Sequence, residues 1–148
     1  NGQRHGVEAR LNLVEADFNL SAMWLLGLAG RGERSLVHAQ ATADMINAML
    51  PRYLAAMTVT PVPATPLFQQ VSAGAFELLD PFETLAEMRM MLDRITLDPL
   101  KFVGVHASNY LPVNGTLQRD KAGMLALVDE VLQSRDPRRL RSDNQRGL

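Results

Sequence analysis

The densest group of chemically useful side chains lies in the stretch "HASNYLP", residues 106–112. His106 could act as an acid, a base or a ligand, and Asn109 and Tyr110 could orient it or donate hydrogen bonds. The same histidine could instead end a strand, hydrogen-bonded to a neighbouring group. Four polar-capable side chains arrive here within five residues, more than a plain strand exit needs, which favours a site. An Asn-Gly pair at 114–115 then signals a turn.

Two other loops could contact a ligand. In "GLAGRGE", residues 27–33, three glycines would let backbone N–H groups approach a ligand closely, and Glu33 could bind a hydroxyl. The loop matches neither the dinucleotide nor the P-loop motif, so a tight turn without a ligand explains it equally well. The second loop, "PVPATPL" at 61–67, is stiffened by prolines and would contribute shape and backbone hydrogen bonds, unless it only punctuates the chain.

Hydrophobic periodicity predicts the elements that hold these loops. Strands are expected at residues 19–26, from residue 52, and at 100–105, and helices at 7–17, 34–50, 80–95 and 117–132. The helix at 80–95 is the best signalled, because Asp80 suits the N-cap, Pro81 the first helical position and Glu83 the third. The Met residues and Trp24 are interpreted as core.

Alternation of helices and strands predicts an α/β fold with parallel strands joined by crossover helices. With 148 residues we expect a partial (β/α) barrel of about three parallel strands and a C-terminal helix, since a complete barrel needs about 250 residues. The three loops would then share the rim at the carboxyl ends of the strands. Residues 1–133 would form this unit, and residues 134–148 an arginine-rich, loosely ordered tail.

Composition narrows the possible chemistry. The chain has no cysteine, which excludes disulfides, a thiol nucleophile and a cysteine-ligated iron–sulfur cluster on this chain. His5 and His38 do not join His106 in a metal-binding trio, so no metal site is expected. A hydrolase using His106 is disfavoured because no serine lies in a nucleophile elbow.

Charge and hydropathy bear on partners and location. The net charge of -1 does not indicate a nucleic-acid partner. The longest apolar stretch, residues 20–30, is too short to span a bilayer, and the first residues lack the pattern of a signal peptide. We therefore expect a cytoplasmic protein without a membrane partner.

Taken together and in order, three stretches resemble a known family: "LLGLAGRGE", "TPVPATPLFQQVSAGAFELLDPFETLAEM" and "HASNYLPVNGTLQRDKAGMLALVDEVL". From about Val7 to Leu132 the chain is similar to the C-terminal half of radical S-adenosylmethionine (SAM) enzymes, in a little-characterised group related to the oxygen-independent coproporphyrinogen oxidase and Elongator-type branches. The resemblance implies a partial (β/α)6 barrel, a [4Fe–4S] cluster on a Cys-x3-Cys-x2-Cys loop, and reductive cleavage of SAM to a 5′-deoxyadenosyl radical.

The resemblance also implies roles for individual residues. The turn that packs along the adenosine of SAM is matched by Leu25, Gly27 and Gly30, with Glu33 close to its acidic position. The strand end that contacts adenine through its backbone is matched by Val62 and Pro63, and Ala64 stands where the family usually has glycine. For the candidate catalytic residues His106, Asn109 and Tyr110 the resemblance supports a position near the substrate but assigns no role.

Two functional hypotheses follow. The first is a piece of a radical SAM enzyme that carries part of the SAM-binding surface, is not catalytic alone, and has the cluster-bearing N-terminal half of the barrel as its partner. The alternative is a stand-alone α/β ligand-binding or interaction domain without catalytic activity. In either case, exposed sheet edges would favour self-association.

Overall fold

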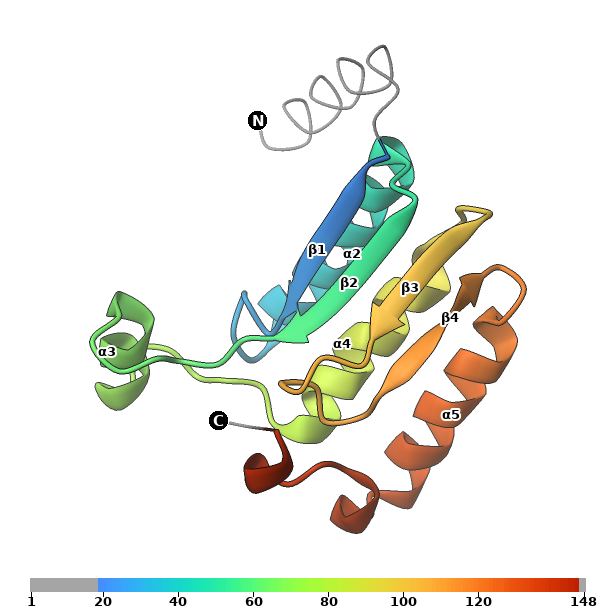
Figure 1. Ribbon diagram of the computed structural model, residues 1–148. Helices are drawn as coiled ribbons and strands as arrows, with labels where there is room; N and C mark the ends of the chain where they lie inside the picture. Colours follow the sequence, from blue (N-terminus) through green and yellow to red (C-terminus); the bar gives the residue numbers. More distant parts are fainter. Residues whose placement is uncertain (1–18, 147–148) are drawn as a thin grey trace.

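The computed structural model describes residues 19–146, which form a four-stranded sheet packed against helices (Figure 1). The expected helix at 7–17 lies outside the described residues. In chain order the elements are β1 (Ser21–Leu26), α2 (Glu33–Met49), β2 (Tyr53–Thr58), α3 (Pro66–Ser72), α4 (Pro81–Arg94), β3 (Leu100–Gly104), β4 (Val113–Leu117) and α5 (Lys121–Ser134). Two 3-10 helices follow, η1 (Pro137–Arg139) and η2 (Asp143–Gln145).

The strands lie in the order β1-β2-β3-β4. Pairing is parallel between β1 and β2 and between β2 and β3, which confirms the α/β class and the parallel core of the sheet. The fourth strand is antiparallel to β3 and was not predicted. The described strands form an open sheet, and its continuation into a partial barrel stays a prediction.

The predicted Asn-Gly turn is wrong, because both residues lie within β4. Asn114 pairs with Val103, and Gly115 pairs with Phe102. A Cβ atom at Gly115 would lie 2.5 Å from the sulfur of Met124 on α5. Close packing of the last helix on this strand therefore explains the glycine, and a local turn signal does not.

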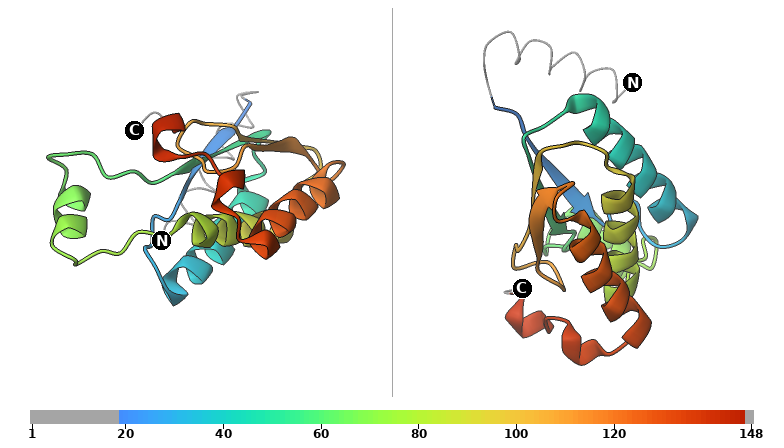
Figure 2. Two further views of the ribbon diagram at one scale, coloured as in Figure 1. Left: turned by 90° about the horizontal axis from the view of Figure 1, so that it is seen from below. Right: turned by 90° about the vertical axis from the view of Figure 1, so that its right-hand side faces the viewer.

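Helices α2, α4 and α5 cover one face of the sheet, and the other face is open (Figures 1 and 2). Alternate strand residues point to the covered face, where Trp24, Leu54 and Phe102 are buried. Their neighbours on the open face remain accessible, with Met23 at 69% and Tyr53 at 42% exposure. The hydrophobic core thus lies between the sheet and one layer of helices.

Helix α4 begins where its sequence predicts. The Asp80 carboxylate accepts a hydrogen bond from the Glu83 backbone N–H at 2.8 Å, and the Glu83 carboxylate accepts one from the Asp80 N–H at 2.7 Å. This reciprocal capping box satisfies N–H groups that a helix start otherwise leaves unpaired. Among residues 19–146, no helix combines the length and the apolar character needed to cross a membrane.

The segment that carries α3 projects from the body of the molecule (Figure 1). We call residues 59–79 the arm. Helix α3 buries none of its residues, and its start is capped by the Thr65 hydroxyl, which accepts a 3.3 Å hydrogen bond from the Phe68 N–H. This short helix was not predicted, because seven residues without a buried face leave no periodic pattern.

The expectation of a loosely ordered tail does not describe its residues up to 146. Beyond α5 the chain turns back as η1 and η2, and Arg146 is only 4% exposed. Its burial depends on contacts with the loop between β3 and β4, which a search for apolar periodicity does not detect.

Candidate functional site

A pocket of about 350 Å³ opens at the carboxyl ends of β1 and β2, on the side of the sheet that helices do not cover. His106 is the one ionisable side chain in its lining. The lining consists of Leu25, Leu28, Met57, Thr58, Val59, Thr60, Leu67, His106 and Ser108. A mostly apolar wall with a few polar groups is typical of a small-molecule site.

The glycine turn after β1 forms one border of this pocket. Gly27 and Gly30 have positive φ angles of 80° and 76°, and the Gly30 N–H donates to the Gly27 carbonyl at 3.1 Å. A Cβ atom on Gly30 would lie 3.1 Å from the Glu77 carbonyl oxygen and 3.2 Å from the Phe76 ring. Gly30 is therefore required both by its backbone conformation and by the close approach of the arm.

A buried carboxylate on α4 stabilises the glycine turn. Glu87 is 1% exposed, and it accepts hydrogen bonds from the Gly27 N–H at 2.9 Å and from the Ser35 hydroxyl. His38 Nδ1 lies 3.4 Å from Glu87 Oε1. Glu87 was not among the site residues predicted from the sequence, although its position between Thr84 and Met91 on the buried stripe of α4 was a usable signal.

His106 lies at the end of β3, exposed, on the wall of the pocket. Its Nδ1 accepts the Ser108 backbone N–H at 3.1 Å and lies 2.9 Å from the Ser108 hydroxyl oxygen. That hydroxyl oxygen accepts the Thr58 N–H at 3.0 Å. The histidine ring is thereby connected through Ser108 to the end of β2.

Asn109 has a different environment from His106. It is fully buried, and its amide group donates to the carbonyl oxygens of Ala56 at 2.8 Å and Gly104 at 3.0 Å. Its side-chain oxygen accepts the Thr58 hydroxyl at 3.0 Å. These bonds join the ends of β2 and β3, so Asn109 positions the loop, and its side chain is turned away from solvent.

Tyr110 is half-buried and does not line the large pocket. Burial raises the pKa of its phenol above the usual value of 10.0, and the nearby Arg146 guanidinium partly opposes that rise. The guanidinium carbon of Arg146 lies 3.7 Å from the centroid of the Tyr110 ring. Tyr110 and Gly27 both line a smaller cavity of about 30 Å³ beside the pocket.

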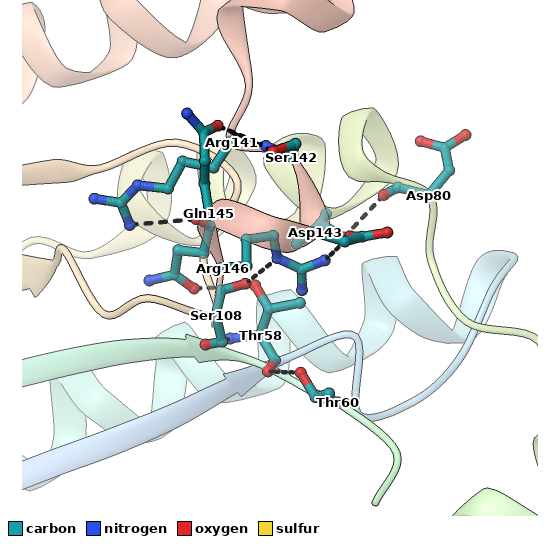
Figure 3. Close-up of polar contacts among 11 residues, drawn as sticks. Thr58, Thr60, Asp80, Ser108, Arg141, Ser142, Asp143, Gln145 and Arg146 are labelled. Atoms are coloured by element: carbon teal, nitrogen blue, oxygen red, sulfur yellow. Dashed lines mark hydrogen bonds and ion pairs between the residues drawn. The ribbon is translucent and has the colours of Figure 1, made fainter. Parts of the chain in front are cut away.

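The C-terminal segment forms hydrogen bonds to the loop between β3 and β4 (Figure 3). Arg146 Nε donates to the Ser108 carbonyl at 2.9 Å, and Arg141 donates to the carbonyls of His106 at 3.1 Å and Val105 at 3.3 Å. The sequence predicts a loosely ordered tail for these arginines. Their partners are backbone oxygens more than 30 residues away, for which the local sequence contains no signal.

The structure brings only part of the predicted site together. Leu25 and His106 line the same pocket, as expected for loops that follow neighbouring strands. The predicted ligand residues Val62, Pro63 and Glu33 are exposed outside its lining, where Thr60 and Leu67 represent the arm instead. Ala64 has a φ of 70°, so the left-handed conformation that favours glycine occurs here with alanine.

The side chains of the described residues offer no site for a metal cluster. Within residues 19–146 no three His, Asp or Glu side chains gather to hold an ion, and the sequence has no cysteine. A [4Fe–4S] cluster therefore does not fit the residues of this chain.

Comparison with protein-family models, curated proteins and solved structures yields no match for this chain. The fold and the pocket define an α/β protein with an open, mostly apolar pocket at the carboxyl ends of parallel strands.

Proposed function

We propose that this chain supplies the adenosine-binding side of a radical SAM-type site and has no catalytic activity by itself. The observation that carries the proposal is the position of the pocket. It lies at the carboxyl ends of β1 and β2, where ligands bind in parallel α/β folds, and residues of all three loops that resemble the family border it.

The arrangement of layers supports this function. In an arc of a (β/α) barrel, strands follow one another in sequence order, helices cover the outside, and the ligand lies on the inside. Here the strand order is sequential and helices cover a single face (Figure 2). The pocket opens on the uncovered face, which corresponds to the inside of such a barrel.

The iron–sulfur chemistry would have to come from another part of the active assembly. No thiolate is available on this chain, so the proposed partner is a cluster-bearing half of the barrel. The cluster grips the amino and carboxylate groups of the methionine moiety of SAM in this family. The surface proposed here would contact adenosine only, through apolar packing on residues such as Leu25 and Leu28 and through hydrogen bonds.

Without the cluster we expect weak binding of adenosine, at millimolar dissociation constants, which corresponds to about 4 kcal/mol. Titration of the isotope-labelled chain with adenosine should shift the amide signals of Leu25, Leu28 and Thr60. Methionine, which lacks the adenosine group, should cause no shifts. Absence of adenosine shifts in the pocket, or shifts confined to the helical face, would refute the proposed function.

A matched pair of leucines tests the location. Leu28 is 50% exposed and lines the pocket, whereas Leu36 is 45% exposed on α2 and does not. Leu28→Asp should abolish the adenosine shifts by placing a charge in an apolar wall, and Leu36→Asp should leave them unchanged. Equal loss in the two variants would mean that binding is not at this pocket.

The open sheet face favours a second candidate, a stand-alone interaction domain. Met23 is 69% exposed and Tyr53 42% exposed on neighbouring strands, and accessible apolar residues on a sheet face are a common feature of interfaces. Sedimentation measurements test this candidate. A concentration-dependent dimer that Met23→Glu disperses would support it, and a monomer at all concentrations would remove self-association as the role of this face.

A further inference from the structure

The hydrogen bonds around His106 determine which of its ring nitrogens carries the proton. A backbone N–H group can only donate, and the Ser108 N–H points to Nδ1 at 3.1 Å. Nδ1 must therefore present its lone pair. In the neutral imidazole the proton is then on Nε2, which has no hydrogen-bond partner among residues 19–146.

The position of this ring is fixed before any ligand binds. Ser108 is 4% exposed, and its hydroxyl oxygen and carbonyl oxygen accept hydrogen bonds from Thr58 and Arg146. Asn109 adds bonds to the ends of β2 and β3. A donor held on such a support loses little conformational entropy when it binds a ligand.

The pocket around the ring indicates what this donor binds. Its other side chains are aliphatic residues, a methionine, threonines and a serine, so no charge of the lining would attract an ionised group. An apolar pocket with one fixed donor discriminates between ligands. A ligand without an acceptor leaves the donor unpaired, which costs binding free energy. The complementary group is a neutral acceptor atom on an otherwise apolar surface.

We propose that His106 is a specificity-determining residue whose Nε2–H donates a hydrogen bond to a neutral acceptor of the bound adenosine. The inference rests on the proposed function, which supplies the ligand class. It assigns to His106 the role of a hydrogen-bond donor, with no proton transfer.

The first test needs no ligand. Long-range nitrogen–proton correlation spectra of the three histidines should show the Nε2–H tautomer for His106 at alkaline pH, where an imidazole is neutral. The variant His106→Asn identifies its signals by their loss. A predominant Nδ1–H tautomer would overturn the proposal.

The same variant separates the two ring nitrogens. An asparagine at 106 can accept the Ser108 N–H with its side-chain oxygen, as in an Asx turn, but it has no group at the position of Nε2. The loop should therefore keep its fold and the unfolding midpoint should change little. His106→Phe, which removes both nitrogens, serves as the second variant and should lower the midpoint.

Adenosine analogues then locate the acceptor. Each analogue lacks one candidate: a ring nitrogen in 1-, 3- and 7-deazaadenosine, or a hydroxyl in 2′- and 3′-deoxyadenosine. With the unmodified chain, one analogue should bind about three- to tenfold more weakly than adenosine, the range of one hydrogen bond. With His106→Asn that difference in affinity should vanish, because the variant has already lost the hydrogen bond that the analogue would remove.

The outcomes separate this inference from the proposed function. Adenosine binding with the same analogue profile in the two proteins would overturn the role of His106 and leave the adenosine site standing. Absence of adenosine binding to the unmodified chain would overturn both.

Discussion

The loop at residues 105–112 and the arm at residues 59–79 flank the same pocket, but they are held in place in different ways. The loop is tied by side chains to two strands and to the C-terminal segment, with Asn109 and Ser108 both buried. The arm carries a helix that buries none of its residues, and Val62 is 58% exposed. Backbone hydrogen bonds tie the arm to the body near its two ends, from Val59 to Leu26 and from Arg31 to Glu77, whereas buried side chains fix the loop itself.

This difference indicates which border of the pocket is preorganised. A loop whose polar groups are paired with the sheet opens only when the sheet edge opens, so its stability follows that of the whole domain. A segment with few buried contacts can open alone at a small free-energy cost. We expect ligand selectivity to come from the loop and adjustment to the ligand to come from the arm.

The largest effect is expected for Asn109→Ala. The substitution removes the donor to the carbonyls of Ala56 and Gly104 and the acceptor of the Thr58 hydroxyl, all in a buried position. We expect a loss of about 2–4 kcal/mol in the free energy of unfolding, measured by urea denaturation. Val62→Ala in the arm is the control and should change it by about 0.5 kcal/mol or less. Similar losses for the two variants would contradict the distinction between loop and arm.

The next effect concerns the C-terminal segment. Arg146→Ala removes the bond to the Ser108 carbonyl and the guanidinium that lies over the Tyr110 ring. Because Arg146 is 4% exposed, we expect a loss of about 1–3 kcal/mol and faster amide exchange at Ser108. Arg138→Ala is the matched control, since that side chain is 88% exposed, and it should have no measurable effect. Unchanged exchange at Ser108 in Arg146→Ala would show that the segment does not support the loop.

A smaller effect, of opposite sign, is expected in the arm. Ala64 has a φ of 70°, where glycine avoids the steric cost of a Cβ atom, so Ala64→Gly should stabilise the arm by about 0.5–1 kcal/mol. Ala73, at the end of α3, has a φ of -84°, and Ala73→Gly should destabilise it. Slower and faster proteolysis of the arm, respectively, would verify the pair. The global unfolding midpoint should not move if the arm opens independently.

The last effect is absent at neutral pH. Burial raises the pKa of Tyr110 above 10.0, so its neutral form is favoured in the folded state. The corresponding stability is fully present below the pKa of the unfolded chain and is lost as pH rises through the folded pKa. Stability should thus fall above about pH 10, and less steeply in Tyr110→Phe. The chain has two tyrosines, so the variant Tyr53→Phe retains only Tyr110. Absorbance titration of this variant measures the pKa of Tyr110 directly. A value at or below 10.0 would contradict the burial of the ring.

The positions of the loops along the sequence predicted more of the candidate site than the types of their residues did. We expected loops that follow parallel strands to share one rim, and Leu25 and His106 do line the same pocket. The sequence proposed His106 and Asn109 alike as site residues. It could not show that one is exposed and the other buried, because that depends on the groups of the neighbouring strands that each side chain contacts. The family resemblance assigned Val62 and Pro63 to a ligand contact, but the arm carries them outside the lining of the pocket.

The amino-acid sequence by itself determined the local elements of this protein. Apolar periods, the Asp80–Glu83 capping box and the glycines of the first turn depend on residues within a few positions of one another, so β1, β2, β3, α2, α4 and α5 were predictable. Tertiary structure alone decided the pairing of β4, the partners of Glu87 and the docking of Arg146. Glu87 and Gly27 are separated by 60 positions, and Arg146 and Ser108 by 38. Such contacts exist only once the sheet and its helices have brought distant segments together, because a buried polar group requires a partner that its own neighbourhood does not supply.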